Sequence, residues 1–328
     1  MQLPKLPMPN LPDIPFVGAL WRASESGGNM FANLVRSLAT SAISVVLVIL
    51  CMWGVEGLYS KIDRTNFPYF YETTYGEKAS DYEKGVAVID AIVNQMRYEL
   101  GSTFGWSAND ILFNKYLLDN RAYRQFGVYN ATKILVENYS MVVARLGQND
   151  KEDTDLFQAR QTDFVFSPER WGFRPFTDTS EYYYERGLKR IESYKKRLAE
   201  GKAVYNCKTN DIYTSFQLVM SDKLLGYAIG ILEDADKLPW YTVDNKIYEA
   251  QGIALVVRDF LAVLYTLYPV KEKYNEVNFN MILENLNKIC TYDPLWMASY
   301  PFNNGTLIRS YLLNAKMRLG DVAESMRT

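Results

Sequence analysis

Two pairs of carboxylates have the residue types and spacing for acid–base chemistry. Asp244 and Glu249 open the most apolar predicted helix, and Glu181 and Glu185 lie one turn apart on another. Two carboxyl groups whose pKa values are split by their surroundings can serve as acid and base on a glycosidic bond. Acidic residues in the first turn of a helix also offset its dipole. We therefore interpret all four as structural and assign no catalytic residue, and keep Asp244 and Glu249 as candidates for a ligand site or buried polar site.

A second polar pair, Arg258 and Asp259, interrupts the apolar helix predicted over 244–268. Because adjacent helical residues point to different faces, we expect that the two do not pair with each other. Each should meet a partner elsewhere in the body, since a buried charge is costly unless it is paired. The pair is also a candidate ligand site. Charges in its middle indicate that this helix is the central helix of the body and not a second membrane span.

Composition excludes several chemistries. The 328 residues contain no histidine, which removes the commonest general base, the commonest zinc ligand and any Ser–His or Cys–His nucleophile. Cys51 lies in an apolar run, so Cys207 and Cys290 either form one disulfide or, as we favour, remain two separate buried thiols. A net charge of −2 argues against nucleic acid as a partner. We expect no enzymatic activity, no cofactor and no metal.

One apolar run stands out from the rest of the chain. The uncharged residues between Arg36 and Glu56 span about 28 Å as a helix, close to the roughly 30 Å hydrocarbon core of a bilayer. A cleaved signal peptide has a shorter apolar region and a small-residue exit site, which is missing here. We therefore predict a retained single-pass transmembrane helix over residues 37–55.

The basic residues around this run indicate its orientation. The tail carries Lys5, Arg22 and Arg36, whereas the segment after the run carries Lys61 and Arg64 as its basic residues. Because cytoplasmic flanks carry the excess of Lys and Arg, we expect a cytoplasmic N-terminus and a periplasmic body, anchored in a bacterial inner membrane.

The predicted organisation has four parts: a Pro-rich tail over 1–36, the span over 37–55, an extended connector over 56–78 and an all-helical extracytoplasmic domain over 79–328. Apolar residues in this domain recur at every third or fourth position, as on one face of a helix. The segments concerned are 86–100, 123–146, 177–202, 210–234, 244–268, 279–289 and 308–322. Without alternating strands or repeats, they predict an all-α, helical-bundle-like body of six or seven helices.

Aromatic residues form two candidate contact surfaces, because aromatic anchors concentrate binding energy. For the run Tyr182–Tyr184 we expect two of the three side chains to pack in the core. In the connector no periodic pattern indicates where the aromatics are buried, so we predict partner binding there. The connector residues are Phe67, Tyr69, Phe70 and Tyr71.

The first sixteen residues form a third candidate contact segment. Prolines that recur every two or three residues exclude a helix or a central strand. A disordered leader is one interpretation, but a solvated linker should be polar, and apolar residues separate these prolines. A polyproline-like strip that docks in a groove of another subunit is the other interpretation. The predicted contact residues are Pro4, Leu6, Pro7, Pro9, Leu11, Pro12, Ile14, Pro15 and Phe16.

Four stretches resemble a bacterial family of membrane-anchored proteins known as domain of unknown function 2333. They are "GWSANDILFNKYLLDNRAYRQFGV" (105–128), "SEYYYERGLKRIESY" (180–194), "PWYTVDNKIYEAQG" (239–252) and "NNGTLIRSYLLNAKMRL" (303–319). The resemblance implies a single-pass inner-membrane protein with an external helical body, and it implies no reaction. The Pro-rich tail departs from the family pattern and inherits nothing from it.

Three functions remain open. We favour a non-catalytic scaffold subunit of an envelope complex, whose partners are other membrane subunits, the bilayer and a possible second copy of the chain. The first alternative is a periplasmic sensor that binds a small molecule. The second is a glycan-acting enzyme that uses Asp244 or Glu249.

Overall fold

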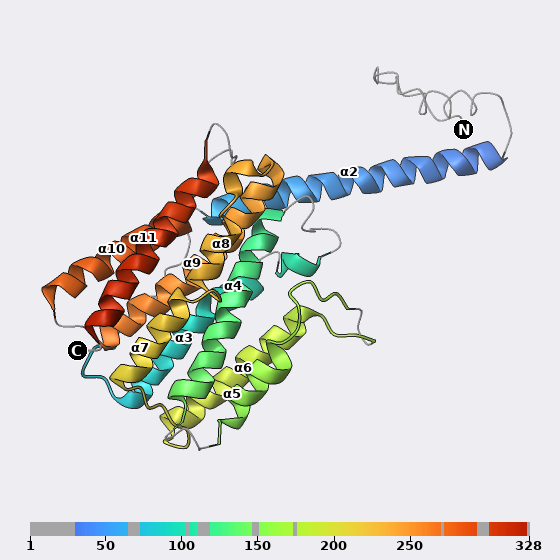
Figure 1. The fold of residues 1–328 in the computed structure, drawn as a ribbon. Coiled ribbons are helices and arrows are strands. Elements are labelled where there is room, and N and C mark those ends of the chain that lie inside the picture. Colours follow the sequence, from blue (N-terminus) through green and yellow to red (C-terminus); the bar gives the residue numbers. More distant parts are fainter. Residues whose placement is uncertain are drawn as a thin grey trace. The chain divides into compact units, whose positions relative to one another are not determined.

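The computed structural model describes residues 30–64, 73–102, 105–110, 119–145, 151–172, 176–269, 272–293 and 302–326 (Figure 1). The chain divides into two compact units, Met1–Val55 and Glu56–Thr328.

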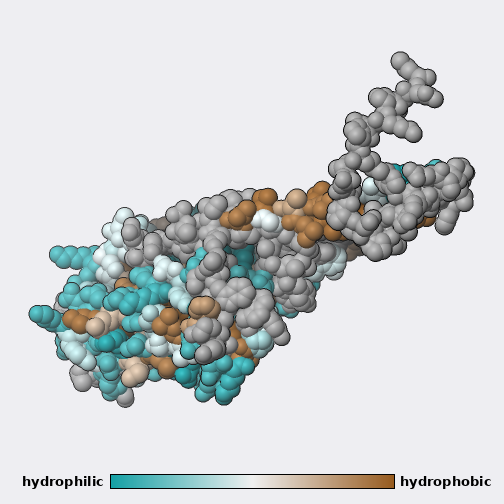
Figure 2. Space-filling view, turned by 90° about the horizontal axis from the view of Figure 1, so that it is seen from above, coloured by the Kyte–Doolittle hydropathy of each residue, from teal (hydrophilic) through white to brown (hydrophobic). Residues whose placement is uncertain are grey.

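The first unit holds most of helix α2 (Met30–Arg64). Its segment Asn33–Met52 is long and apolar enough to cross a membrane, and none of this segment is buried. Figure 2 shows part of the apolar surface of the protein in brown. Such a helix is compatible with a membrane anchor or a signal sequence. Helix α2 is longer than the span predicted over 37–55, and its last turns occupy the start of the segment predicted as an extended connector.

The second unit is an all-α body. Its helices are α3 (Asp81–Gly101), α4 (Asp119–Asn138), α5 (Thr154–Gln158), α6 (Ser180–Ala199), α7 (Thr209–Met220), α8 (Leu225–Ile231), α9 (Trp240–Leu267), α10 (Lys273–Cys290) and α11 (Asn304–Ser325). Short 3-10 turns η1 (Ser107–Asn109) and η4 (Ala235–Lys237) and π turns η2 (Tyr139–Val143) and η3 (Ala159–Asp163) complete it. The described residues contain no strand, and seven helices of the body have twelve residues or more, which confirms the predicted fold class.

Helix α9 is the buried centre of the body, as predicted. Every residue from Ala250 to Leu264 is buried, and the helix contacts α3, α4, α8, α10 and α11. An isolated helix that is apolar nearly all round would be unstable in water, and this one is covered by its neighbours. Its apolar sequence is therefore explained by the core.

Helices α4 and α9 touch through their backbones. A Cβ atom added to Gly127 would lie 2.0 Å from the carbonyl oxygen of Glu249. One added to Gly252 would lie 2.1 Å from the carbonyl oxygen of Arg124. Real Cβ atoms do not approach other atoms so closely, so any larger residue must push the two helices apart. These two glycines set the distance between the helices.

The two helices run parallel (Figure 1). Asp119 and Asp244, near their N-termini, are close enough to repel each other electrostatically. Further along, Leu135 and Phe260 line the same small cavity. Residue numbers therefore rise in the same direction along α4 and α9. The contact between the two glycines lies between the Asp119–Asp244 pair and the Leu135–Phe260 pair.

Several helix boundaries differ from the prediction. The helix predicted over 210–234 is two helices, because the Ser221 hydroxyl donates to the Leu218 carbonyl and accepts from the Lys223 amide, which replaces helical bonds at that point. Ser107 and Asn109 lie in η1. Helix α5 and η3 form between the segments predicted as helices at 123–146 and 177–202.

The cysteines confirm the favoured interpretation of separate thiols. Cys207 and Cys290 are both free. Cys290 is buried, whereas Cys207 is only half-buried. Burial raises the pKa of the Cys290 thiol to about 12, as expected for a small hydrophobe that is not a nucleophile.

The glycine contact generates a stability prediction. Gly127→Ala places a methyl group against the α9 backbone, which we expect to lower the free energy of unfolding by about 3 kcal/mol. Gly230→Ala is the matched control, because a Cβ there meets nothing within 4 Å. It should change stability by less than about 1 kcal/mol. Chemical denaturation of the full chain in detergent measures both, and equal effects would contradict the close helix contact.

Candidate functional site

The irregular segment between η3 and α6 carries Phe176, the most exposed of the aromatic side chains described in the body. We name its described residues, 164–172 and 176–179, the aromatic loop. Trp171 is 54% exposed and Phe176 is 80% exposed, and Val165 is also exposed. The loop contains no strand in its described part, in agreement with the packed loop that its prolines and glycine predict.

Buried side chains hold every second carbonyl of the aromatic loop. The carbonyls of Phe164, Phe166, Pro168 and Arg170 all accept hydrogen bonds from the body, so the residues between them face outward. The donors are Tyr129 Oη to Phe164 (2.9 Å), Tyr184 Oη to Phe166 (2.8 Å), Trp106 Nε1 and Ser180 Oγ to Pro168 (2.9 and 3.1 Å), and Asn109 Nδ2 and the Ser180 amide to Arg170 (2.9 and 3.1 Å). The backbone of residues 164–170 is therefore fixed, and the exposed Trp171 follows it directly.

A stack of rings and guanidinium groups covers one side of the loop. The Phe166 and Tyr183 rings lie 3.9 Å apart between centroids. The Arg170 guanidinium lies 4.4 Å from the Phe166 centroid, and the Arg186 guanidinium lies 4.9 Å from the Tyr183 centroid. Such contacts are favourable at exposed sites by about 0.5–1 kcal/mol each.

The predicted Tyr182–Tyr184 run divides as expected. Tyr184 is buried and Tyr183 packs partly against the core, whereas Tyr182 is half-exposed and does not join the core. Burial is the main cause that raises the pKa of Tyr184 far above its ordinary value. This hydroxyl therefore stays protonated and can donate to the loop.

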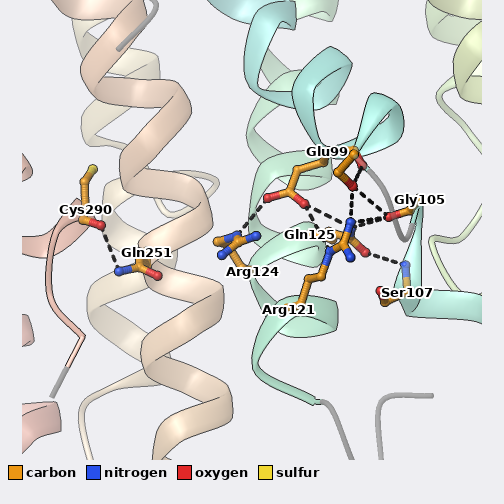
Figure 3. A network of polar contacts seen from close by, with 9 residues as sticks. Glu99, Gly105, Ser107, Arg121, Arg124, Gln125, Gln251 and Cys290 are labelled. Atoms are coloured by element: carbon orange, nitrogen blue, oxygen red, sulfur yellow. Dashed lines mark hydrogen bonds and ion pairs between the residues drawn. The ribbon is translucent and has the colours of Figure 1, made fainter. Parts of the chain in front are cut away.

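A buried ionic network positions the residues that hold the loop (Figure 3). Glu99 of α3 is 2% exposed and accepts from Arg124 Nε of α4 at 2.7 Å. Gln125 Nε2 joins Glu99 to the Gly105 carbonyl, and Gln125 Oε1 accepts from the Ser107 amide at 2.8 Å. Arg121 also donates to the Gly105 carbonyl. The network thus fixes residues 105–109, from which Trp106 and Asn109 reach the loop.

Burial alone would raise the pKa of Glu99. The charges of Arg124 and Arg121, together with hydrogen bonds from Arg124 and Gln125, outweigh burial and lower the pKa of Glu99 below its ordinary value. Glu99 is therefore ionised at neutral pH, and its charge is paired.

Arg258 and Asp259 correct the sequence prediction, because they do contact each other. Arg258 Nη2 lies 2.8 Å from Asp259 Oδ1, and both side chains are fully buried. The prediction was wrong because the long arginine side chain bends back to its neighbour. Each residue also has the expected second partner: Gln95 Nε2 donates to Asp259 at 2.6 Å, and Arg258 donates to Asn287 at 3.4 Å. The pair ties α9 to α3 and α10.

Asp244 and Glu249 are half-buried and have separate partners. Burial, followed by the charge of Asp119, raises the pKa of Asp244 to about 6. Burial also raises the pKa of Glu249, whose carboxylate accepts from the Tyr227 hydroxyl at 2.9 Å. Five residues of helix correspond to a rotation of about 140°, so the two carboxylates lie on different faces of α9. They do not converge on one point, as an acid–base pair must.

The remaining predicted carboxylates lie beside the aromatic loop. Glu181 accepts from Asn109 Nδ2 at 3.1 Å, whereas Glu185 is exposed. Burial and then the charge of Glu181 raise the pKa of Asp110 to about 6, and Arg121 opposes this shift.

No cluster of three or more His, Cys, Asp or Glu side chains with the geometry of a metal site occurs within the described ranges. The predicted contact residues Pro4, Leu6, Pro7, Pro9, Leu11, Pro12, Ile14, Pro15, Phe16, Phe67, Tyr69, Phe70 and Tyr71 lie outside those ranges.

The sequence model of a family described as uncharacterized proteins conserved in bacteria (DUF2333) matches residues 25–226. The chain belongs to this family. The match confirms the resemblance and includes two of the four stretches that carried it, those at 105–128 and 180–194. No curated protein and no solved structure matches the chain.

In this DUF2333 protein, the matched region contains the aromatic loop and the network beneath it, and the sequence analysis proposed neither of them as a functional site. Arg121, Arg124 and Gln125 recur at the spacing of one helix face, and that spacing was the available signal. Trp171 and Phe176 lie in a segment without periodicity, the same signal that drew attention to residues 67–71. The match ends before α9.

Removal of the central buried charge should be costly. Glu99→Gln removes the buried carboxylate that pairs with Arg124 and Arg121, which we expect to lower the free energy of unfolding by about 3–5 kcal/mol. The matched control is Glu192→Gln, whose partner Arg97 is more than one-third exposed. It should cost less than about 1 kcal/mol. A Glu99→Gln protein as stable as the control would contradict the structural role of the network.

Asp244 should make stability depend on pH. Its folded-state pKa of about 6 lies above the roughly 3.9 of an unfolded Asp, so the folded state favours the protonated acid. The associated stability is complete below about pH 4 and is lost as the pH rises through about 6. Asp244→Asn should therefore raise the free energy of unfolding at pH 8 by about 1 kcal/mol, allowing for solvent screening, and leave it unchanged at pH 4.

Urea titrations at the two pH values measure this difference. Asp321→Asn, at an exposed position of α11, is the control and should show no such pH dependence. An equal gain for Asp244→Asn at both pH values would show that its ionisation is not the cause.

Proposed function

We propose that the protein is a non-catalytic, single-pass membrane-anchored scaffold subunit of a multiprotein complex in the bacterial envelope. The observation that carries this proposal is the aromatic loop, in which buried donors bind the carbonyls of Phe166, Pro168 and Arg170. Trp171, which follows directly, is 54% exposed. A surface of this kind binds without first having to be ordered, which favours contact over chemistry.

The anchor is the second part of the proposal. Helix α2 has the length and apolar surface of a membrane span. The basic residues of the tail favour an inner-membrane protein with a cytoplasmic N-terminus and a periplasmic body. In this arrangement the Pro-rich tail meets cytoplasmic or membrane partners, and the body meets periplasmic ones.

Rigidity of the body is the third part. The buried charges described above join α3 to α4, α9 to α3 and α9 to α10. These paired charges connect neighbouring helices, and their side chains are engaged with their partners and not available for catalysis. A rigid body suits a subunit that holds partners at defined positions.

A ligand-binding sensor is the alternative that one observation favours. An open cleft of about 470 Å³ lies where the ends of several helices meet, lined by Lys84, Ile212, Tyr268 and Met326 among others. The Lys84 ammonium lies 4.8 Å from the centroid of the Tyr268 ring in its wall. A thermal-shift screen of metabolites tests the sensor, since a ligand that binds the folded state must raise its melting temperature.

The scaffold predicts a specific loss of partners. We expect proteins that co-purify with the full chain from detergent-solubilised membranes to be lost when residues 1–16 are deleted, while the chain stays in the membrane fraction. Quantitative mass spectrometry of the purified material measures this loss. A second variant replaces the five prolines of this segment by alanine, which keeps its length and apolar residues but removes its polyproline character, and it should also lose these partners. A strictly monomeric chain without partners would contradict the scaffold.

A further inference from the structure

We infer that helix α10 pairs with α10 of a second copy of the chain, antiparallel and about a two-fold axis near Val277. This pairing rests on the proposed scaffold function and names one partner of the scaffold. The surface concerned lies wholly within described helices of the body, α10 and α11, and its contact requires no position of α2 relative to that body.

Helix α10 carries three exposed apolar side chains in a row, which we name the α10 stripe. Tyr274, Val277 and Met281 are 64%, 50% and 38% exposed. They recur at steps of three and four residues, so they lie along one side of the helix. Among the described helices of the body, no other has three large apolar side chains exposed at this spacing. Single exposed apolar residues are ordinary, whereas a contiguous set marks an interaction surface.

The opposite side of α10 already attaches the helix to the body. Phe279, Ile282 and Leu286 are fully buried there and belong to the core. The α10 stripe is therefore not needed to dock the helix in its own chain. Its apolar surface remains available to another molecule.

Helix α11 widens the exposed apolar surface. The two helices lie side by side (Figure 1). Two hydrogen bonds of 2.8 Å show that they are antiparallel: Asn275 Nδ2 to Ser325 Oγ and Arg318 Nη1 to Asn278 Oδ1. Met317, which is 70% exposed, therefore comes near the level of Met281. Methionine side chains are flexible and polarizable, so these two can adapt to a partner surface.

The α10 stripe complements its own reverse. Tyr274 lies three residues before Val277, and Met281 lies four residues after it. In an antiparallel pair whose axis passes near Val277, Tyr274 of each copy meets Met281 of the other. The two Val277 side chains then meet each other. Every apolar residue of the stripe thus has an apolar partner, as a two-fold interface between identical surfaces requires.

The charges at the ends of the stripe also favour the antiparallel pair. Lys273 precedes the stripe and Glu284 follows it, and both are exposed. Glu284 pairs with Lys288 of its own helix at 2.7 Å but remains 62% exposed. Reversal brings Glu284 to the first turn of the other α10, where Lys273 and the helix dipole are both positive. A parallel pair would instead place Glu284 beside Glu284, which is unfavourable.

The proposed anchor makes a small interface sufficient. A stable complex of two soluble proteins buries about 800 Å² on each partner. Copies that are anchored in one bilayer share a thin layer, which raises their effective concentration. One pair of helices can then associate without a larger contact. Since the stripe matches itself in apolar residues and in charge, the second copy is the occupant to which we assign it.

Cysteine cross-linking of the full chain in native membranes tests the pairing. The background variant carries Cys51→Ser and Cys207→Ser, and it retains Cys290 because that thiol is buried. Val277→Cys then places a thiol near the axis, where it faces the same residue of the second copy. Val165→Cys is the matched control, because Val165 is 48% exposed and lies on another part of the body.

With copper phenanthroline as oxidant, we expect at least half of the Val277→Cys chains to form disulfide-linked dimers. Fewer than a tenth of the Val165→Cys chains should do so. Absence of dimers at position 277, or equal yields at both positions, overturns the inference. A cross-linked product of another mass also overturns it, because a different protein then occupies the stripe.

A mixed sample tests the antiparallel register. Chains with Tyr274→Cys and chains with Met281→Cys are co-expressed with different tags, and mixed dimers should exceed the dimers of Tyr274→Cys with itself at least fivefold. In this register the two Tyr274 positions lie about 10 Å apart along the helix direction, beyond the reach of a disulfide. Self-linking of Tyr274→Cys without mixed dimers would indicate a parallel pair and overturns the inference.

Co-purification separates failure of this inference from failure of the proposed function. Chains that do not cross-link through position 277, yet lose co-purifying proteins when residues 1–16 are deleted, leave the scaffold intact and remove the second copy alone. Chains that neither cross-link nor co-purify with any protein contradict both.

Discussion

The contact between α4 and α9 at Gly127 and Gly252 is the constraint on which the rest of the body depends. Because the two backbones touch there, α4 has one position relative to the central helix. That position carries Arg124 to Glu99 and Tyr129 to the carbonyl of Phe164. A displacement of 1 Å would break hydrogen bonds whose lengths are near 2.8 Å. The close contact of two glycines thus determines where the surface loop lies, although neither glycine touches it.

Buried charge gives the second layer of organisation. Glu99 loses its hydration entirely, and only the charges and hydrogen bonds of Arg121, Arg124 and Gln125 keep it ionised. Such a network is costly unless it is complete, so it permits one arrangement of helices and excludes those that leave a member unpaired. The same donors bind the backbone around Gly105 and Ser107, whose neighbours hold the loop. The path from core to loop is therefore a continuous series of hydrogen bonds.

The parts of the fold that sequence reasoning predicted are those that depend on local patterns. Helix α6 was predictable because its caps, charged turns and apolar spacing agree, and α9 because it is apolar on all sides. The buried face of α4 was not, because charged and small residues such as Arg124, Gly127 and Ala131 belong to it beside Val128 and Leu135, while the large Phe126 and Ile134 are only half-buried. Small residues indicate a close helix contact only once the partner helix is known.

The candidate site was harder still to predict, for a similar reason. The conformation of the aromatic loop is set by Trp106, Asn109, Tyr129 and Tyr184, which come from three other segments. No window of sequence contains that information. The Arg258–Asp259 pair was mispredicted because a helical wheel gives each side chain one fixed direction. The long, flexible arginine side chain can bend and reach a neighbour on another face of the helix.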